Sequence, residues 1–316
     1  MKVLRKCGKI LLIFLLCVIG LLVLAWGGLN VGKFIIYSDY YAKETSLCEN
    51  PGLGDGFVCQ GIAVSETDGK YFVSGYMKDD SASRIYVTDE ENNSYYVTLQ
   101  KANGEAFTGH AGGIAYTNGT LYIANGKKIY TLSADAVLNA QNGDSVSIDE
   151  GTKVNNSASF VYTDESYLYV GEFHDGGKYV TEHPYETAEG THYAIVSRYS
   201  INDLSKPDKI YSIRDKVQGI CFTPDGKVVM STSYGLTDTV YYVYNESEAT
   251  DSGKTLDGAK VYYLEKCVQE FKGPAMGEDL DYSDGKIVTL TESASDKYIF
   301  GKFFFANKIV GLDLSK

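Results

Sequence analysis

The sequence predicts an all-β protein, a β-propeller with five four-stranded blades, preceded by one N-terminal transmembrane helix. A strand–turn–strand pattern occurs five times after residue 57, and an uncharged apolar run fills Ile10–Trp26. The composition agrees, because 33 Gly and 27 Tyr against 5 Pro suit short strands joined by tight turns. We expect a cytoplasmic tip and membrane segment over 1–32, a linker or ring-closing strand over 33–56, and the propeller over 57–316.

The apolar run Ile10–Trp26 predicts an uncleaved membrane anchor. As a helix it spans roughly 25 Å, which is the short end of a hydrocarbon core, and apolar residues can extend it to Val31. Four cations precede it and place the N-terminus in the cytoplasm and the rest of the chain outside the cell membrane: Lys2, Arg5, Lys6 and Lys9.

Two alternatives to an uncleaved anchor exist for this segment. A cleaved signal peptide is the main alternative, but its small-residue site, Ala25-Trp26-Gly27, is poor. A lipoprotein anchor at Cys17 is disfavoured because the bulky Leu15 and Leu16 precede that cysteine.

Charge and composition exclude two classes of protein. The chain has 29 basic and 41 acidic residues, a formal charge of −12, which argues against nucleic-acid binding because phosphate neutralisation needs clustered Lys and Arg. An apolar content of 44% excludes a disordered chain.

The repeated pattern begins at positions 46 to 60 residues apart, which are Gly61, Gly113, Ser159, Gly219 and Asp279. Four of the five repeats carry a strong hairpin-turn dipeptide: Asp68-Gly69, Asn118-Gly119, Asp225-Gly226 and Asp284-Gly285. Four-stranded units at this period indicate propeller blades. One or two β-sandwiches are the alternative, and a sixth blade within 33–58 or 142–156 stays open.

Further strands complete the blades. We expect outer strands at 145–149 for blade two and 259–265 for blade four. The short fifth blade needs an outer strand from the N-terminal side, either Phe34–Ser38 or the segment near Phe57. Phe303-Phe304-Phe305 is an alternative third strand of blade five.

The blade starts carry a resemblance to a known family. They are Gln60-Gly61-Ile62-Ala63, Gly112-Gly113-Ile114-Ala115 and Gln218-Gly219-Ile220-Cys221, followed by Phe222-Thr223-Pro224-Asp225-Gly226-Lys227. The chain resembles bacterial extracytoplasmic propellers of the YVTN and gluconolactonase/strictosidine-synthase-like type. The resemblance implies the architecture and transfers no catalytic set, because fold does not imply function.

Propeller topology predicts which residues share a face. Residues before each inner strand and after each second strand lie on one face, where ligands of propellers bind. Two insertions, 174–192 and 294–306, enlarge this face. The predicted ligand-binding residues at this channel mouth are Gln60, Tyr76, Asn156, His174, Gln218, Tyr234, Glu292 and Lys297.

The same face carries the candidates for chemistry. His110, Glu172 and Glu278 are the candidate catalytic residues, and Glu172, Glu278 and Asp279 are the candidate metal ligands, with Ca²⁺ the ion that oxygen ligands would suit. The spacing fixes no metal site, and the chain has no G-x-S-x-G, H-E-x-x-H or P-loop motif.

We therefore expect a membrane-anchored binding module for an extracytoplasmic protein, glycan or small molecule. A metal-dependent hydrolase of the lactonase or phosphoesterase type is the alternative function. Cys48 and Cys59 are the candidate disulfide, since both lie on the oxidising side of the membrane. The ectodomain is expected to be monomeric.

Overall fold

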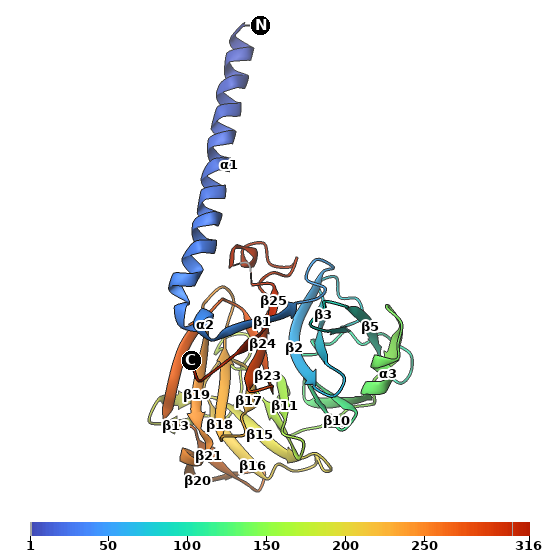
Figure 1. The fold of residues 1–316 in the computed structure, drawn as a ribbon. Helices are drawn as coiled ribbons and strands as arrows, with labels where there is room; N and C mark the ends of the chain where they lie inside the picture. Colours follow the sequence, from blue (N-terminus) through green and yellow to red (C-terminus); the bar gives the residue numbers. More distant parts are fainter. Residues whose placement is uncertain (1, 305) are drawn as a thin grey trace.

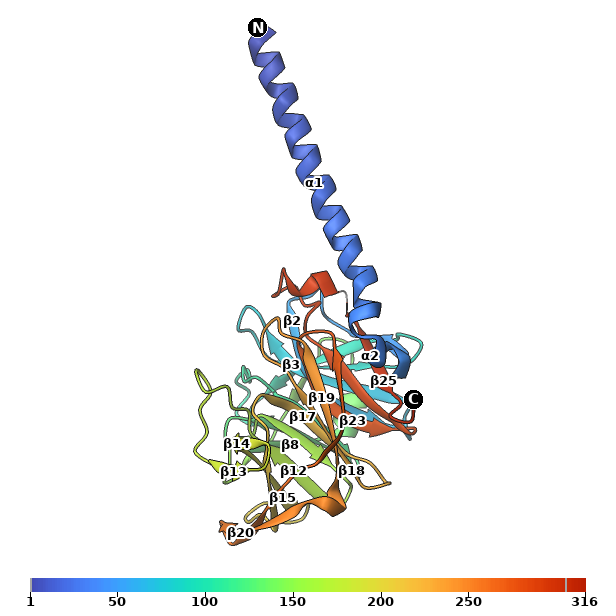
Figure 2. The same ribbon diagram turned by 90° about the vertical axis from the view of Figure 1, so that its left-hand side faces the viewer.

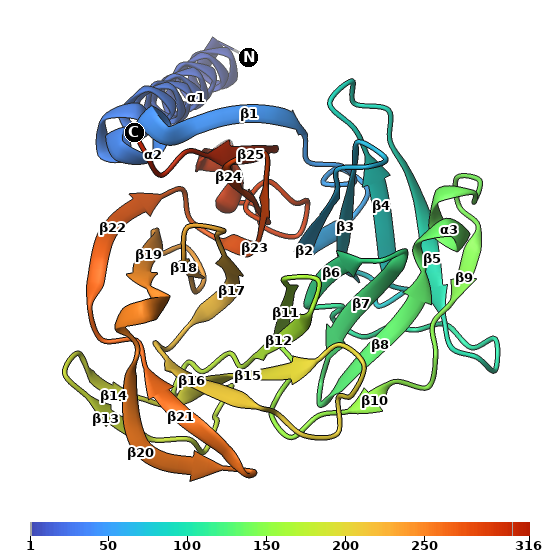
Figure 3. The same ribbon diagram turned by 60° about the horizontal axis from the view of Figure 1, so that its bottom comes forward.

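The computed structural model describes residues 2–304 and 306–316 as one long helix attached to a ring of five blades (Figures 1 and 3). Helix α1 contains a segment, Lys6–Ile36, that is long and apolar enough to cross a membrane. The helices are α1 (Lys2–Ile36), α2 (Ser38–Lys43) and α3 (Ala134–Leu138), with 3₁₀ turns η1 (Glu246–Glu248) and η2 (Gly301–Phe304).

The blades follow one another along the chain. Blade one is formed by β2 (Phe57–Ser65), β3 (Lys70–Met77), β4 (Arg84–Thr88), β5 (Tyr95–Gln100) and β9 (Ser145–Ser147). Blade two is formed by β6 (Gly113–Thr117), β7 (Thr120–Asn125), β8 (Lys128–Ser133) and β10 (Thr152–Lys153). Blade three is formed by β11 (Phe160–Thr163), β12 (Tyr167–Gly171), β15 (Ala194–Ser200), β16 (Lys209–Ile213), β21 (Ala259–Tyr263) and β20 (Thr250–Leu256).

The last two blades have four strands each. Blade four is formed by β17 (Val217–Phe222), β18 (Lys227–Thr232), β19 (Thr239–Asn245) and β22 (Cys267–Gly273). Blade five is formed by β23 (Gly277–Ser283), β24 (Lys286–Thr291), β25 (Lys308–Leu312) and β1 (Glu44–Glu49). A separate hairpin, β13 (Tyr185–Thr187) and β14 (Gly190–His192), projects from blade three.

The predicted hairpin turns lie where the dipeptides indicated. Both residues of Asn118-Gly119 have positive φ, 49° and 74°, and so do Asp284 and Gly285, at 47° and 74°. Two consecutive positive φ values define the type I′ turn, which matches the twist of the strands it joins.

The strand that closes the ring, β1, lies within the 33–56 segment that was expected to supply it, but at neither of the two positions named as candidates. β1 pairs antiparallel with β25, with Glu44 opposite Leu312 and Glu49 opposite Lys308. Phe34–Ile36 is the last turn of α1 and not a strand. The helical hydrogen-bond pattern continues through it, since Tyr37 N donates to Lys33 O at 2.8 Å. Phe57 instead begins the inner strand of blade one.

Two predicted edge strands and one alternative third strand also differ from the structure. Ser145–Ser147 pairs parallel with β5 of blade one, and Ala259–Tyr263 pairs parallel with β16 of blade three. The outer strand of blade four is β22 instead. Phe303 and Phe304 belong to η2, and Phe305 lies outside the described residues. An alternating apolar pattern identifies a strand but not the sheet edge it joins, which explains these errors.

The five inner strands approach one another closely around the propeller axis. β2, β6, β11, β17 and β23 contact in that cyclic order, as Figure 3 shows. A Cβ atom on Gly113 would lie 2.7 Å from Phe160 Cα, and one on Gly219 would lie 2.6 Å from Asp279 Cα. Because these neighbours are backbone atoms, a side chain at either position forces two strands apart.

The carboxyl group of Asp279 lies at the propeller axis, between the inner strands. Asp279 is fully buried, and its Oδ2 accepts hydrogen bonds from Ile62 N and Ile114 N, both at 3.4 Å. Asp279 therefore links blade five to blades one and two. Burial raises the pKa of Asp279 well above its ordinary value.

We expect Gly113→Ala and Gly219→Ala each to lower the free energy of unfolding by ~1–3 kcal/mol, the usual cost of overpacking. The measurement is urea unfolding of the full chain in detergent. Gly54→Ala is the matched control, because a Cβ there meets nothing within 4 Å. Equal stability of all three variants would contradict the close approach of the inner strands.

Candidate functional site

A pocket of about 800 Å³ opens at the channel mouth, where loops from all five blades converge. Eight of the residues predicted for this face line it: Gln60, Tyr76, His110, Gln218, Tyr234, Glu278, Glu292 and Lys297. They are positioned by the starts of the inner strands and the ends of the second strands. We call this cavity the mouth pocket.

A chain of polar contacts crosses the mouth pocket from its rim to its floor. Lys297 Nζ donates a hydrogen bond to Tyr76 OH and lies 4.4 Å from the centroid of that ring. Tyr76 OH is 3.4 Å from Tyr298 OH, which donates to Glu292 Oε2 at 3.2 Å. Gln60 Nε2 donates to the same carboxyl oxygen at 2.9 Å. Blades one and five thus share one network.

Two buried carboxyl groups form the floor of the mouth pocket. Glu278 and Glu292 are 3% and 8% exposed. Burial raises the pKa of Glu292 to about 7. Burial, with the nearby carboxyl groups of Glu292 and Asp279, raises the pKa of Glu278 well above its ordinary value. The floor therefore holds a Glu278 whose burial favours the protonated form, which can donate a hydrogen bond, beside a Glu292 that titrates near neutral pH.

His110 stands on the wall of the same pocket. Its ring meets the ring of Tyr76 edge-on, with the centroids 4.7 Å apart. Burial, followed by the charges of Lys297 and Lys178, lowers the pKa of His110. A neutral imidazole offers one hydrogen-bond donor and one acceptor.

Glu172 and His174, both predicted for the mouth, do not line the pocket. Glu172 Oε2 lies 2.8 Å from His183 Nδ1 and accepts a hydrogen bond from Ile195 N at 3.2 Å. The hydrogen bond to Glu172 raises the pKa of His183. The His174 ring stacks on Tyr193 at 4.9 Å. These residues fasten the 174–192 insertion to blade three, which is why they face away from the mouth.

Asn156 and Asp279 also lie outside the mouth pocket. Asn156 Nδ2 donates to Val170 O at 2.9 Å, and its Oδ1 accepts from Tyr199 OH at 3.2 Å. Asp279 faces the axis, because neighbouring residues of a strand point to opposite sides. Glu172, Glu278 and Asp279 are therefore not brought together. In residues 2–304 and 306–316, no group of three His, Cys, Asp or Glu side chains has a metal-binding arrangement.

Cys48 and Cys59 are both buried free thiols, so the predicted disulfide is not formed. Cys48 lies in the closing strand β1, opposite Ile309, whereas Cys59 lies in the inner strand β2. Cys59 Sγ donates to Thr291 O at 3.4 Å. Burial raises the pKa of Cys48 to about 12, which disfavours the reactive thiolate.

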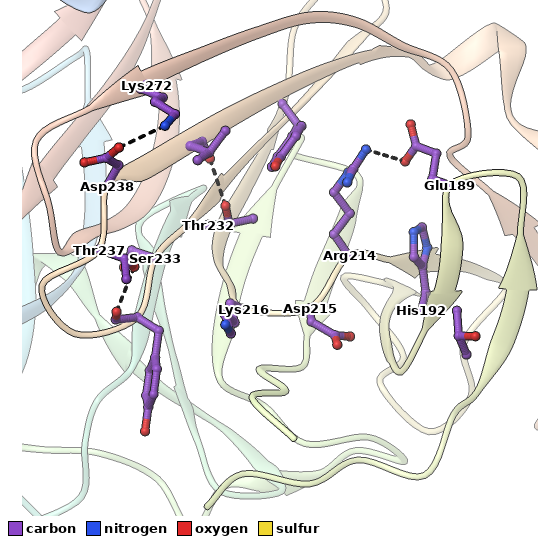
Figure 4. A pocket seen from close by; sticks show the side chains of 14 residues that line it. Glu189, His192, Arg214, Asp215, Lys216, Thr232, Ser233, Thr237, Asp238 and Lys272 are labelled. Atoms are coloured by element: carbon purple, nitrogen blue, oxygen red, sulfur yellow. Dashed lines mark hydrogen bonds and ion pairs between the residues drawn. The ribbon is translucent and has the colours of Figure 1, made fainter. Parts of the chain in front are cut away.

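A second pocket, of about 560 Å³, lies between blades three and four (Figure 4). Four of its charged groups form two ion pairs. Arg214 lies 2.7 Å from Glu189 and donates to Tyr244 OH at 2.6 Å, and Lys272 lies 3.1 Å from Asp238. The contacts of Glu189 and Arg214 with Tyr244 hold the β13–β14 hairpin against blade four, so we assign this pocket a structural role.

Several lining residues of the mouth pocket were missed from the sequence. Phe173, Lys178 and Tyr179 come from the 174–192 insertion and its preceding residue, and Met276 precedes β23. The insertion itself was the available signal, because its aromatic and cationic residues Tyr179 and Lys178 lie on the same long loop as its three histidines.

No protein-family model and no curated protein matches the sequence. Three solved structures are similar in part. The PQQ-bound aldose sugar dehydrogenase from Streptomyces coelicolor is 14% identical over 79% of each chain, with a TM-score of 0.44. The WD40 propeller domain of Doa1 is 14% identical over 78% of this chain and 79% of that chain, with a TM-score of 0.40. BamB from Moraxella catarrhalis is 7% identical over 81% and 83%, with a TM-score of 0.33. Likeness at this level carries no functional argument.

We expect the free energy of unfolding to fall as pH rises from about 5 to about 8, in part through Glu292. Its pKa is about 7 in the folded protein against 4.5 ordinarily, so the folded state binds more protons in that interval. The contribution of Glu292 to the free energy of unfolding is fully present below pH 4.5 or so and is lost as the pH rises through about 7. Its largest size is about 3 kcal/mol.

Urea unfolding of the full chain at several pH values checks this expectation. Glu292→Gln, which keeps the shape and the hydrogen bond from Gln60, should flatten the slope. Glu150→Gln is the control, because Glu150 is exposed. An unchanged slope in Glu292→Gln would show that Glu292 is ionised throughout.

Proposed function

We propose that the protein is a membrane-anchored, extracytoplasmic binding module whose mouth pocket takes a hydroxyl-rich small molecule or glycan unit with an anionic group. The observation that carries the proposal is the mouth pocket itself: about 800 Å³, enclosed by loops of five blades, with polar groups on its floor. Pockets of this size suit small ligands, whereas a protein partner needs a broader surface.

The polar groups of the pocket support a hydroxyl-rich ligand. Gln60 offers its amide oxygen as an acceptor, since its Nε2 donates to Cys59 O and to Glu292 Oε2. Gln218 Nε2 donates to Ser233 Oγ at 3.4 Å, which leaves one N–H and the amide oxygen for a ligand. Glu278, whose protonated form is favoured by burial, can both donate and accept. A hydroxyl group also does both, so each can pair with such a group. Bare carboxylates, which would suit a metal ion, are disfavoured on this floor at neutral pH.

The walls and the rim support the rest of the assignment. Tyr76, Phe173 and Tyr234 supply aromatic faces for the C–H surface of a sugar ring. Lys178 and Lys297 supply positive charge for an anionic group such as a carboxylate or phosphate. The extracytoplasmic orientation follows from the four cations that precede the apolar run. Membership of the YVTN or gluconolactonase-like type remains a proposal from the blade-start motifs.

The metal-dependent hydrolase fits this geometry less well. The Glu172 carboxyl group contacts His183, and the Asp279 carboxyl group accepts a hydrogen bond from Ile62 N at the axis, so neither is available as a metal ligand at the mouth. A different catalytic function has one supporting observation, the carboxyl pair Glu278 and Glu292. Neighbouring acids with separated pKa values can serve as proton donor and acceptor, so acid–base cleavage of the bound glycan is the second candidate.

We expect acidic sugars to raise the melting temperature of the full chain in detergent more than their neutral parents do. The probes are glucose, glucuronate and glucose 6-phosphate, together with short oligosaccharides containing uronic acids. Lys297→Gln should weaken binding of the acidic probes by roughly ten- to a hundredfold, the cost of one charge-assisted hydrogen bond. Lys266→Gln, a change of an exposed lysine outside the pocket, is the control.

Two outcomes count against the proposal: no probe stabilises the protein, or Lys297→Gln leaves the preference for acidic probes intact. Tyr76→Phe separates packing from hydrogen bonding, since it keeps the ring against His110 and removes the hydroxyl group. For the second candidate, Glu278→Gln should retain binding and abolish release of the reducing sugar.

A further inference from the structure

The mouth pocket and the membrane helix lie on the same side of the propeller. The 294–306 loop carries Lys297 and Tyr298 into the pocket and continues into η2, which contacts α1. Figures 1 and 2 show η2 beside the base of α1, on the side of the ring from which the helix leaves. The propeller therefore presents its mouth face toward whatever surrounds the helix.

The junction between helix and propeller holds this orientation. One residue, Tyr37, separates α1 from α2, and α2 is followed at once by the closing strand β1. Tyr37 and Tyr40 are buried, and Tyr37 OH donates to Asp238 Oδ1 at 3.0 Å. The Tyr40 ring stacks on Tyr241 at 6.0 Å. No flexible linker separates the two parts.

The apolar surface of α1 continues down to the propeller. The 31 residues of Lys6–Ile36 extend roughly 46 Å as a helix, more than the ~30 Å of a hydrocarbon core. Ile35 and Ile36 are 76% and 61% exposed, although they lie directly before the junction. A bilayer that covers these side chains reaches the face of the propeller from which α1 leaves.

Exposed apolar side chains are concentrated around the mouth. Of the eight large apolar residues that are exposed outside α1 in the described part of the chain, six lie on loops of the mouth face: Tyr179, Val180, Tyr234, Leu236, Ile299 and Phe300. They come from blades three, four and five. Val180 and Ile299 are 65% and 75% exposed. We call these six residues the apolar rim.

Lysines accompany the aromatic residues of the rim and the pocket. Lys178 Nζ lies 4.9 Å from the Tyr179 ring centroid, and Lys216 Nζ lies 6.0 Å from that of Tyr234. Neither lysine, nor Lys297, forms a salt bridge with a carboxylate of the described residues. Tyrosine with lysine suits a membrane–water interface, where the ring sits among headgroups and the ammonium meets lipid phosphate.

We propose that the apolar rim docks onto the outer surface of the bilayer that holds α1, so that the mouth pocket opens toward lipid headgroups. Apolar side chains enter the interface, and the lysines pair with anionic headgroups. The position of the helix, the short junction and the rim composition each point to this surface. The docking does not depend on what the pocket binds.

Depth-dependent quenching tests the docking. The full chain, carrying Cys7→Ser, Cys17→Ser and Cys267→Ser, receives Val180→Cys or Ile299→Cys and a polarity-sensitive fluorophore. It is reconstituted into vesicles of phosphatidylethanolamine and phosphatidylglycerol that contain lipids with nitroxide quenchers near the headgroup. Val268→Cys is the matched control, since Val268 is also exposed and lies beside Asp313 and Gly285, away from the mouth.

Docking predicts blue-shifted, quenched fluorescence at 180 and 299 and no quenching at 268. The reference for an inserted label is Cys17 within α1, labelled in a separate variant that keeps this cysteine and carries only Cys7→Ser and Cys267→Ser. Replacing phosphatidylglycerol by phosphatidylcholine should reduce the quenching at 180 and 299. A polar, unquenched environment at both positions, while the Cys17 label shows α1 inserted, would overturn the proposal and leave the rim for a protein partner. Equal quenching at 268 would also overturn it, because the propeller would then contact the bilayer through another surface than its mouth face.

Discussion

The packing of five inner strands around a narrow axis is the constraint on which the rest of the molecule depends. Gly113 and Gly219 let neighbouring strands approach until a Cβ would collide with backbone. The Asp279 side chain reaches the axis, where it accepts hydrogen bonds from two backbone N–H groups of other blades. Closure by β1 and β25 completes the ring, so no inner strand can move without displacing its neighbours.

The same packing explains the chemistry of the mouth. Because the inner strands nearly touch, the axis is blocked below the mouth, and Glu278 and Glu292 are held against protein on the pocket floor. Desolvation raises their pKa values, and hydrogen bonds from Gln60 and Tyr298 offset only part of that effect at Glu292. The floor therefore combines Glu278, whose protonated form is favoured, with Glu292, which titrates near neutral pH, and the lysines Lys178 and Lys297 stand around them.

Local sequence signals predicted the blades and much of the mouth. Asn118-Gly119 and Asp284-Gly285 identified turns because only a few residue types tolerate two positive φ values in succession. Strand direction then placed Gln60, His110 and Gln218 on one face. The wrong predictions concern contacts between residues far apart in the sequence or on different loops. The alternating pattern of Ala259–Tyr263 does not indicate that this strand pairs with blade three. The spacing of the repeats does not indicate that the Glu172 side chain contacts His183. Such choices depend on which surfaces remain unpaired after the ring has closed.

The anchor and the pocket have one structural origin. The chain enters the ring through its outermost strand, and the short α1–α2 junction sets the helix beside blade five, whose 294–306 loop reaches both η2 and the pocket. A pocket on the far face would be open to the surrounding solution. On this face, with the rim docked, the ligand must pass between the rim and the headgroups. We therefore extend the two proposals: a glycan unit that is held in the bilayer by a lipid tail avoids that barrier, whereas a free sugar has to cross it.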